Sequence, residues 1–214
     1  KAIIEAGHEV AAVVTQPDKP KGRSKALVCS PVKEEAMLHG LRILQPQRAR
    51  DEEFIRELKA INADVFVVVA FGQILPSSII NMPPYGCINV HASLLPKYRG
   101  ASPIQWAVID GCEYSGVTIM KMDEGIDTGD ILKKEEVKLN PKETGGSLFE
   151  RLSDVGARLL VKTLEELEAG TVVPVPQNDA ESSYVKMLDK SFGKVDFNQD
   201  AVKIERLIRG LNPW

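Results

Sequence analysis

An asparagine and a histidine two positions apart, Asn89 and His91, are the residues whose types and spacing best suit chemistry. They stand at the end of an apolar run that predicts a β-strand, closed by a Leu-Leu-Pro turn. Side chains alternate along a strand, so both residues face the same way. An amide can donate to a developing oxyanion and an imidazole can move a proton, which suits acyl transfer. The alternative is that Asn89 caps a turn and His91 is an ordinary half-buried residue.

A second polar segment, the acidic loop, covers residues 122–130 with the sequence Met-Asp-Glu-Gly-Ile-Asp-Thr-Gly-Asp. Its acids and glycines predict a tight polar turn between two apolar stretches. A carboxylate here could orient His91 and stabilise its imidazolium form. The residues alone leave a solvated turn as the alternative and four acids as equal candidates for this role: Asp123, Glu124, Asp127 and Asp130.

The elements that position these residues alternate between apolar runs and segments of helical periodicity. This alternation predicts an α/β protein with an open, mostly parallel sheet and helices on both faces. The expected strands are residues 10–14, 41–44, 65–70, 116–120 and 131–137, together with the strand that carries Asn89 and His91, into which residues 86–88 lead. The expected helices are residues 31–39, 51–60, 103–109, 145–168 and 201–209. Ligands bind such sheets at the carboxyl ends of strands, so one cleft is expected from three loops, at residues 71–76, 91–100 and 122–130.

Three segments together resemble the folate-dependent formyltransferases, and among them those that act on methionyl-tRNA. They are Asn-Val-His-Ala-Ser-Leu-Leu-Pro at 89–96 with Arg-Gly at 99–100, Gly-Val-Thr-Ile-Met at 116–120, and Gly-Ile-Asp-Thr-Gly-Asp at 125–130. The resemblance implies a Rossmann-like formyltransferase fold, with Asn89, His91 and Asp127 as catalytic residues. It implies transfer of a formyl group from 10-formyltetrahydrofolate to the α-amino group of methionyl-initiator tRNA, in support of translation initiation.

The same resemblance assigns a formyl-folate site to Ser93, Leu94, Leu95 and Pro96. The loop after the apolar run at 65–70 offers further apolar contacts and backbone groups to a flat ring such as a pterin. Simple packing at a strand end is the alternative for this loop. In this loop we expect four residues to contact the folate: Phe71, Gly72, Ile74 and Leu75.

A basic loop at residues 16–25 is interrupted by Pro and Gly. From residue 16 to residue 50, eight Lys and Arg side chains face three acids, although the whole chain carries a net charge of −3. Such a patch suits phosphate attraction, and a solvated loop is the alternative. The resemblance implies contact with the tRNA acceptor stem, with Arg23 as the main contact beside Lys21 and Lys25.

The composition is that of an ordinary globular protein, with 43% hydrophobic and 27% charged residues. No apolar run approaches the roughly 20 residues of a membrane span. The three cysteines are scattered, which favours a reducing cytoplasm over a disulfide framework or a zinc site. We therefore expect a cytoplasmic monomer without a metal ion or a membrane partner.

We expect a catalytic domain over residues 1–170, a linker or edge segment over 171–190, and the start of a second domain over 191–214. The first residues are typical of the end of a helix stopped by Gly7, so we expect a preceding first strand. In the resembled family a small β-barrel that grips tRNA follows the linker. We therefore interpret the chain as a fragment with a truncated C-terminal tRNA-binding domain.

Three other functions remain open from the sequence. The first is another formyl-folate enzyme: a glycinamide ribonucleotide or sugar-nucleotide formyltransferase, or a formyl-folate hydrolase. The basic loop and the linker favour tRNA over these. The second is a nucleotide-binding α/β module without catalysis, which the absence of a Gly-x-Gly-x-x-Gly motif disfavours. The third is a non-functional scaffold with an exposed sheet edge and an incomplete folate pocket.

Overall fold

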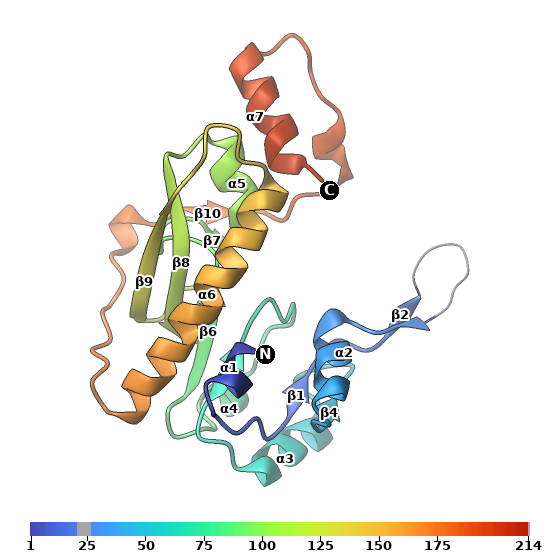
Figure 1. Cartoon of the computed structure of the whole chain (residues 1–214), viewed down its shortest axis with the longest axis vertical. Coiled ribbons are helices and arrows are strands. Elements are labelled where there is room, and N and C mark those ends of the chain that lie inside the picture. The colour runs from blue at the N-terminus through green and yellow to red at the C-terminus, as the bar shows by residue number, and fades with distance from the viewer. Residues whose placement is uncertain (21–26, 214) are drawn as a thin grey trace. The chain divides into compact units, whose positions relative to one another are not determined.

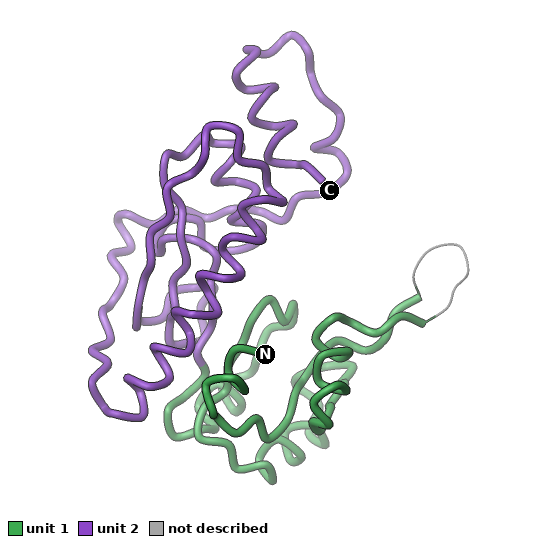
Figure 2. Tube along the Cα trace, viewed as in Figure 1, with its two compact units in different colours: residues 1–87 green, residues 88–214 purple. Residues whose placement is uncertain are grey.

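The computed structural model describes residues 1–20 and 27–213, in two compact units. The first unit covers residues 1–87 and the second covers residues 88–214 (Figure 2). The residues predicted to contact tRNA, Lys21, Arg23 and Lys25, lie outside the described residues.

The first unit contains short strands and helices in alternation (Figure 1). β1 and β4 pair in parallel, with Val13 opposite Ile43, and β2 and β3 form an antiparallel pair, with Lys19 opposite Val28. The strands are shorter than the apolar runs predicted. The elements are α1 (Ala2–Glu5), β1 (Val13–Val14), β2 (Lys19–Pro20), β3 (Leu27–Val28), α2 (Pro31–Leu38), β4 (Ile43–Leu44), α3 (Glu52–Ile61), β5 (Phe66–Val68) and α4 (Ser77–Ile80).

Helix α2 begins where the sequence predicts. The Ser30 side chain accepts a hydrogen bond from the Lys33 N–H, and Pro31 occupies the first helical position. Lys33 also donates through Nζ to Asp18 at 2.6 Å. This bond, followed by one from Gln45, holds the pKa of Asp18 below its usual range, and it raises the pKa of Lys33. The pair ties the base of the basic loop to α2.

The second unit is built on a sheet in which β6, β8 and β9 lie side by side (Figure 1). β6 and β8 are antiparallel, with Asn89 opposite Met120 and His91 opposite Thr118, and β8 pairs with β9 in the same sense. The elements are β6 (Cys87–His91), β7 (Arg99–Gly100), α5 (Pro103–Ile109), β8 (Tyr114–Lys121), β9 (Ile131–Lys138), α6 (Gly145–Glu168), η1 (Asp179–Glu181), β10 (Tyr184–Val185), η2 (Lys190–Gly193) and α7 (Ala201–Leu211).

Helix α6 covers one face of this sheet. It starts at a reciprocal capping box between Thr144 and Ser147, and it runs along β8 and β9. Its buried apolar side chains lie on one face of an amphipathic helix, three or four positions apart except for the adjacent Leu159 and Leu160: Leu148, Leu152, Val155, Leu159, Leu160 and Leu164. Each buried leucine stabilises the fold by about 1.5–3 kcal/mol relative to an exposed one. α7 packs against α5 and α6 within the same unit.

The predicted α/β fold class is confirmed, and the β1–β4 pair shows the expected parallel pairing. The antiparallel pairing of β8 with β9 has a simple cause. Only the acidic loop joins them, and a connection of this length closes a hairpin but not a parallel crossover. Among the described residues no helix is long and apolar enough to cross a membrane. The division into domains at residues 170 and 190 stays a prediction.

Candidate active site

The end of β6 brings together the three residues predicted to be catalytic. Asn89 donates through Nδ2 to Oδ1 of Asp127 at 3.4 Å, and Nδ1 of His91 lies 3.6 Å from Oδ2 of the same carboxylate. His91 is 6% exposed and the Asp127 side chain 15%, so little water screens the contact. The alternation along β6 correctly predicts that Asn89 and His91 share a face.

Asp127 is the acid that the acidic loop presents to His91. Its backbone is left-handed, with φ of +54°, a region that Asp tolerates better than most residues. Its Oδ2 also accepts a hydrogen bond from the Gly100 N–H at 2.8 Å. Asp123, by contrast, accepts from the Gly125 N–H and the Thr128 hydroxyl, so it holds the loop itself together.

The second ring nitrogen of His91, Nε2, lies 2.9 Å from the carbonyl oxygen of Tyr98. A carbonyl oxygen only accepts, so Nε2 carries the proton in this arrangement, and Nδ1 is the nitrogen that faces Asp127. The Tyr98 carbonyl therefore fixes the tautomer of His91 in this arrangement. The sequence gives no sign of this contact because every residue has a backbone carbonyl.

Tyr98 is itself held in an unusual conformation. Its φ is +60°, which an aromatic residue seldom adopts. Its N–H donates to the Ser183 hydroxyl, and its own hydroxyl donates to Asp110 at 2.9 Å and lies 3.0 Å from Cys112 Sγ. Burial, and then hydrogen bonding with Cys112 and Asp110, raises the pKa of Tyr98. These contacts keep the carbonyl directed at His91.

The turn predicted to bind folate is held by β8. The Thr118 hydroxyl donates to the Ser93 carbonyl at 2.6 Å and accepts from the Leu95 N–H at 3.1 Å. The side chains of Ser93 and Leu95 are buried, so they shape the turn, whereas Leu94 and Pro96 are partly exposed.

The other residues predicted to contact folate lie in the loop after β5, in the first unit. Ile74 is 89% exposed, which leaves its side chain free to contact a ligand. The carbonyl of Phe71 accepts a hydrogen bond from Gln16, and Leu75 is half-buried. Gly72 is exposed. Contact of these four residues with folate stays a prediction.

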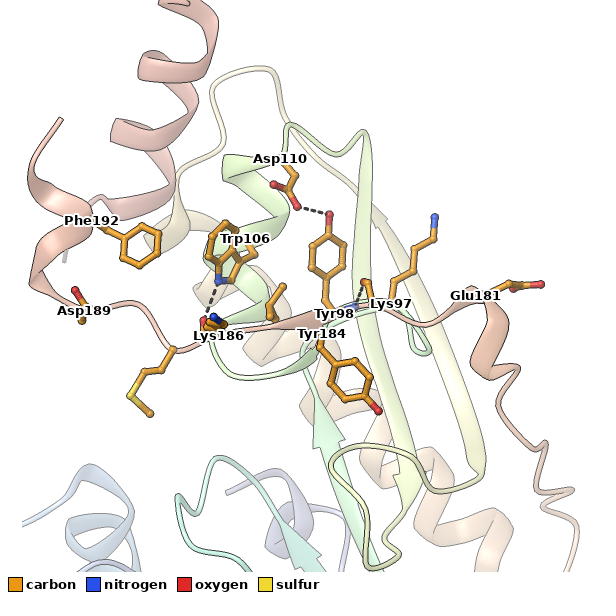
Figure 3. A pocket seen from close by; sticks show the side chains of 12 residues that line it. Lys97, Tyr98, Trp106, Asp110, Glu181, Tyr184, Lys186, Asp189 and Phe192 are labelled. Atoms are coloured by element: carbon orange, nitrogen blue, oxygen red, sulfur yellow. Dashed lines mark hydrogen bonds between the residues drawn. The ribbon is translucent and has the colours of Figure 1, made fainter. Parts of the chain in front are cut away.

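A cavity of about 620 Å³ lies in the second unit, beside Tyr98 (Figure 3). The rings of Trp106 and Phe192 meet edge to face at 5.6 Å on its wall, and Met187 adds an exposed apolar side chain. Tyr98 joins this cavity to the catalytic residues through its bond to His91. Sequence reasoning missed the cavity because its walls come from two distant segments, 97–110 and 181–192.

The described residues contain no group of three or more His, Cys, Asp or Glu side chains that could hold a metal ion. The described cysteines are all free. Burial raises the pKa of the Cys87 thiol to about 12, so this cysteine stays a neutral thiol and is a poor nucleophile. The polar groups that meet at the end of β6 are the Asn89 amide, the His91 imidazole and the Asp127 carboxylate.

Comparison with known proteins places this geometry in a family. Residues 1–164 match the model of the formyl transferase family. A methionyl-tRNA formyltransferase from Lachnospira eligens is 79% identical over 214 residues, which are 100% of this chain and 68% of that protein. Another from Agathobacter rectalis is 60% identical over the same length and is covered to 69%. A sugar N-formyltransferase from a Shewanella species has a TM-score of 0.70 at 25% identity, over 83% of this chain and 70% of that one.

Proposed function

The chain belongs to the formyl transferase family, among the methionyl-tRNA formyltransferases, and we propose that Asn89, His91 and Asp127 carry its formyl transfer. The reaction moves a formyl group from a formyl-folate to the amino group of methionyl-initiator tRNA, which serves translation initiation. One observation carries the assignment of residues. A single carboxylate, that of Asp127, meets both the Asn89 amide and the His91 ring.

In this mechanism the neutral α-amine of methionyl-tRNA attacks the formyl carbon on N10 of tetrahydrofolate. A carbon–nitrogen bond forms, and the carbonyl oxygen becomes an oxyanion. Asn89 donates to the oxyanion from the Nδ2 hydrogen that does not point at Asp127. Collapse of the intermediate breaks the bond to N10. The formyl group is then on the amine, and tetrahydrofolate leaves.

The remaining step moves one proton from the attacking amine to the departing N10. His91 and Asp127 act here as a unit, because Nε2 of His91 is committed to the Tyr98 carbonyl while Nδ1 faces the carboxylate. Asp127 accepts the amine proton, directly or through a water molecule, and this proton passes to N10 as the bond between N10 and the formyl carbon breaks, which restores the carboxylate. As a carboxylate, Asp127 stabilises His91 when the ring is charged. When the His91 ring is charged, its Nδ1 hydrogen is donated to the oxyanion.

Substrate binding is proposed for three segments. The turn of Ser93, Leu94, Leu95 and Pro96 and the loop of Phe71, Gly72, Ile74 and Leu75 bind 10-formyltetrahydrofolate. Arg23, with Lys21 and Lys25, contacts the phosphates of the tRNA acceptor stem. We further propose that the enzyme works as a cytoplasmic monomer and needs no metal ion.

The test is a competition assay with the full-length protein, 10-formyltetrahydrofolate and three acceptors: methionyl-initiator tRNA, glycinamide ribonucleotide and water. Transfer to tRNA alone supports the proposal. Transfer to another acceptor would keep the catalytic residues but reject the role of the basic loop. R23A separates the two binding roles, since it should raise the KM for tRNA and leave that for the folate unchanged. A defect confined to the folate would contradict the tRNA contact.

A further inference from the structure

Gln177 is the half-buried residue between two exposed neighbours, Pro176 and Asn178, in a segment predicted to be a linker. Its side chain reaches the acidic loop. Nε2 donates to the carbonyl of Asp127 at 2.9 Å and to the carbonyl of Gly129 at 2.7 Å. The side-chain amide of Gln177 therefore donates both of its hydrogens to backbone carbonyls of the loop that carries the proposed catalytic carboxylate.

The orientation of this amide is set by Arg99. Nε and Nη2 of Arg99 donate to Oε1 of Gln177 at 3.1 and 2.9 Å. If the amide were flipped, its NH₂ group would face the donors of the guanidinium and its oxygen would face two carbonyls, which is unfavourable on both sides. Arg99 has no acceptor and keeps its charge, so the correct orientation persists at all working pH values.

Arg99 is in turn firmly held. Its side chain is only 2% exposed, and it also donates to Asp179 at 2.8 Å and to the Tyr184 hydroxyl at 3.1 Å. The Arg99 N–H donates to the Ser183 carbonyl, and β7 pairs with β10. The segment from 177 to 185 is thus bound to β7 by backbone and side-chain hydrogen bonds.

The two residues of β7 therefore restrain Asp127 at two places, its side-chain carboxylate and its backbone carbonyl. Gly100 holds the carboxylate of Asp127 directly, through its N–H. Arg99 acts on the Asp127 carbonyl through the amide of Gln177. A residue with left-handed backbone, such as Asp127, needs restraint at its peptide groups to keep its side chain aimed.

We propose that Gln177 is a positioning residue for formyl transfer. Gln177 fixes the backbone of Asp127 and thereby the position of the Asp127 carboxylate beside His91. This rests on the catalytic role proposed for Asp127. Gln177 does not touch the reacting atoms and acts only through the acidic loop. One residue of the segment predicted to be a linker, Gln177, thus supports the catalytic carboxylate.

The test compares Q177A and Q177E with a control, N178A, in the full-length protein. The carboxylate introduced by Q177E keeps an oxygen for Arg99 but cannot donate to the two carbonyls. We expect kcat to fall about tenfold in Q177A and at least as far in Q177E, with melting temperatures and both KM values near those of the unsubstituted protein. Among the described residues, the Asn178 side chain bonds to Ala180 and Glu181 and not to Arg99 or the acidic loop, so N178A should leave kcat unchanged.

A double-mutant cycle separates positioning from general loosening of the fold. If Gln177 acts through Asp127, Q177A should change kcat less than twofold in a D127N background. Equal losses of kcat in both backgrounds, or normal turnover by Q177E, would overturn the proposal. D179A provides a milder perturbation, because the Asp179 side chain is 82% exposed and Arg99 keeps its bonds to Gln177 and Tyr184. It should lower kcat two- to threefold by loosening Arg99, and no change would count against the proposal. Normal activity of D127N would instead reject the catalytic role of Asp127.

Discussion

The N–H of Gly100 donates to Oδ2 of Asp127 at 2.8 Å, whereas Nδ1 of His91 lies 3.6 Å from the same oxygen. The carboxylate is therefore fixed by the backbone rather than by the imidazole. Because it keeps its place when His91 gains a proton, it can stabilise the charged ring without rearranging. Such a fixed charge is what electrostatic preorganisation requires.

Asn89→Ala should lower kcat by about 10²–10³-fold, the usual cost of losing one oxyanion donor. The affinity for 10-formyltetrahydrofolate should change little, because the side chain acts on charge that develops only in the transition state. Steady-state kinetics and equilibrium folate binding check both parts. A turnover number equal to that of the unsubstituted protein would remove Asn89 from the mechanism.

Asp127→Asn should be at least as damaging as Asn89→Ala, since an amide can neither accept the amine proton nor stabilise a charged His91. Asp123→Asn is the matched control from the same loop. Its amide oxygen can still accept from Gly125 and Thr128, so activity should stay within about threefold. The reverse order of effects on kcat would show that Asp123, and not Asp127, is the catalytic acid.

Gly100→Ala should destabilise the fold by about 1–3 kcal/mol and reduce turnover. At φ of +100°, a Cβ on Gly100 would lie 2.5 Å from the Val185 carbonyl oxygen, so β7 and β10 must shift apart, which disturbs the Gly100 N–H bond to Asp127. Gly193→Ala, where a Cβ meets nothing within 4 Å, serves as the control. Thermal unfolding and kcat of both variants are measured together. An unchanged melting temperature and an unchanged kcat in Gly100→Ala would contradict this role of Gly100.

Thr118→Val should weaken folate binding and cost about 1–3 kcal/mol of stability, because it leaves the Ser93 carbonyl and the Leu95 N–H without their shared partner. Thr163 is an equally buried threonine whose hydroxyl donates only to a carbonyl of its own helix. Thr163→Val should therefore cost less and leave the KM for folate unchanged. Equal effects of the two substitutions on that KM would argue against the folate turn.

Glu143→Gln should destabilise the protein by about 1–3 kcal/mol at pH 7. Burial opposes ionisation of Glu143, but bonds from the Ser147 hydroxyl, the Asn140 N–H and Arg151 together hold its pKa below the usual range. The stability that this charge provides is fully present above the unfolded pKa of about 4.3 and is lost as pH falls through the lower folded value. Melting temperatures of the two proteins should therefore converge below about pH 4. A difference that is constant with pH would refute the assignment.

Sequence patterns predicted the longer helices, but they missed the short strands β2, β3 and β7. The bounds of α5 and α6 are the same as those predicted, since proline, capping residues and helical periodicity act locally. The shared face of Asn89 and His91 also follows from local alternation. The residues of the acidic loop did not show which acid would face His91, because the approach of Asp127 depends on its left-handed backbone. The roles of the Tyr98 carbonyl and of Gln177 depend on contacts between distant segments, which no short pattern encodes.

β8 lies between two strands and has six consecutive buried residues, from 115 to 120. Its amide hydrogens are thus expected to exchange with solvent only when the whole second unit opens. A ligand that binds the folded state slows such exchange by mass action. The slowest amides of this protein, although they touch no substrate, should consequently report folate binding at the neighbouring turn more faithfully than the residues of that turn.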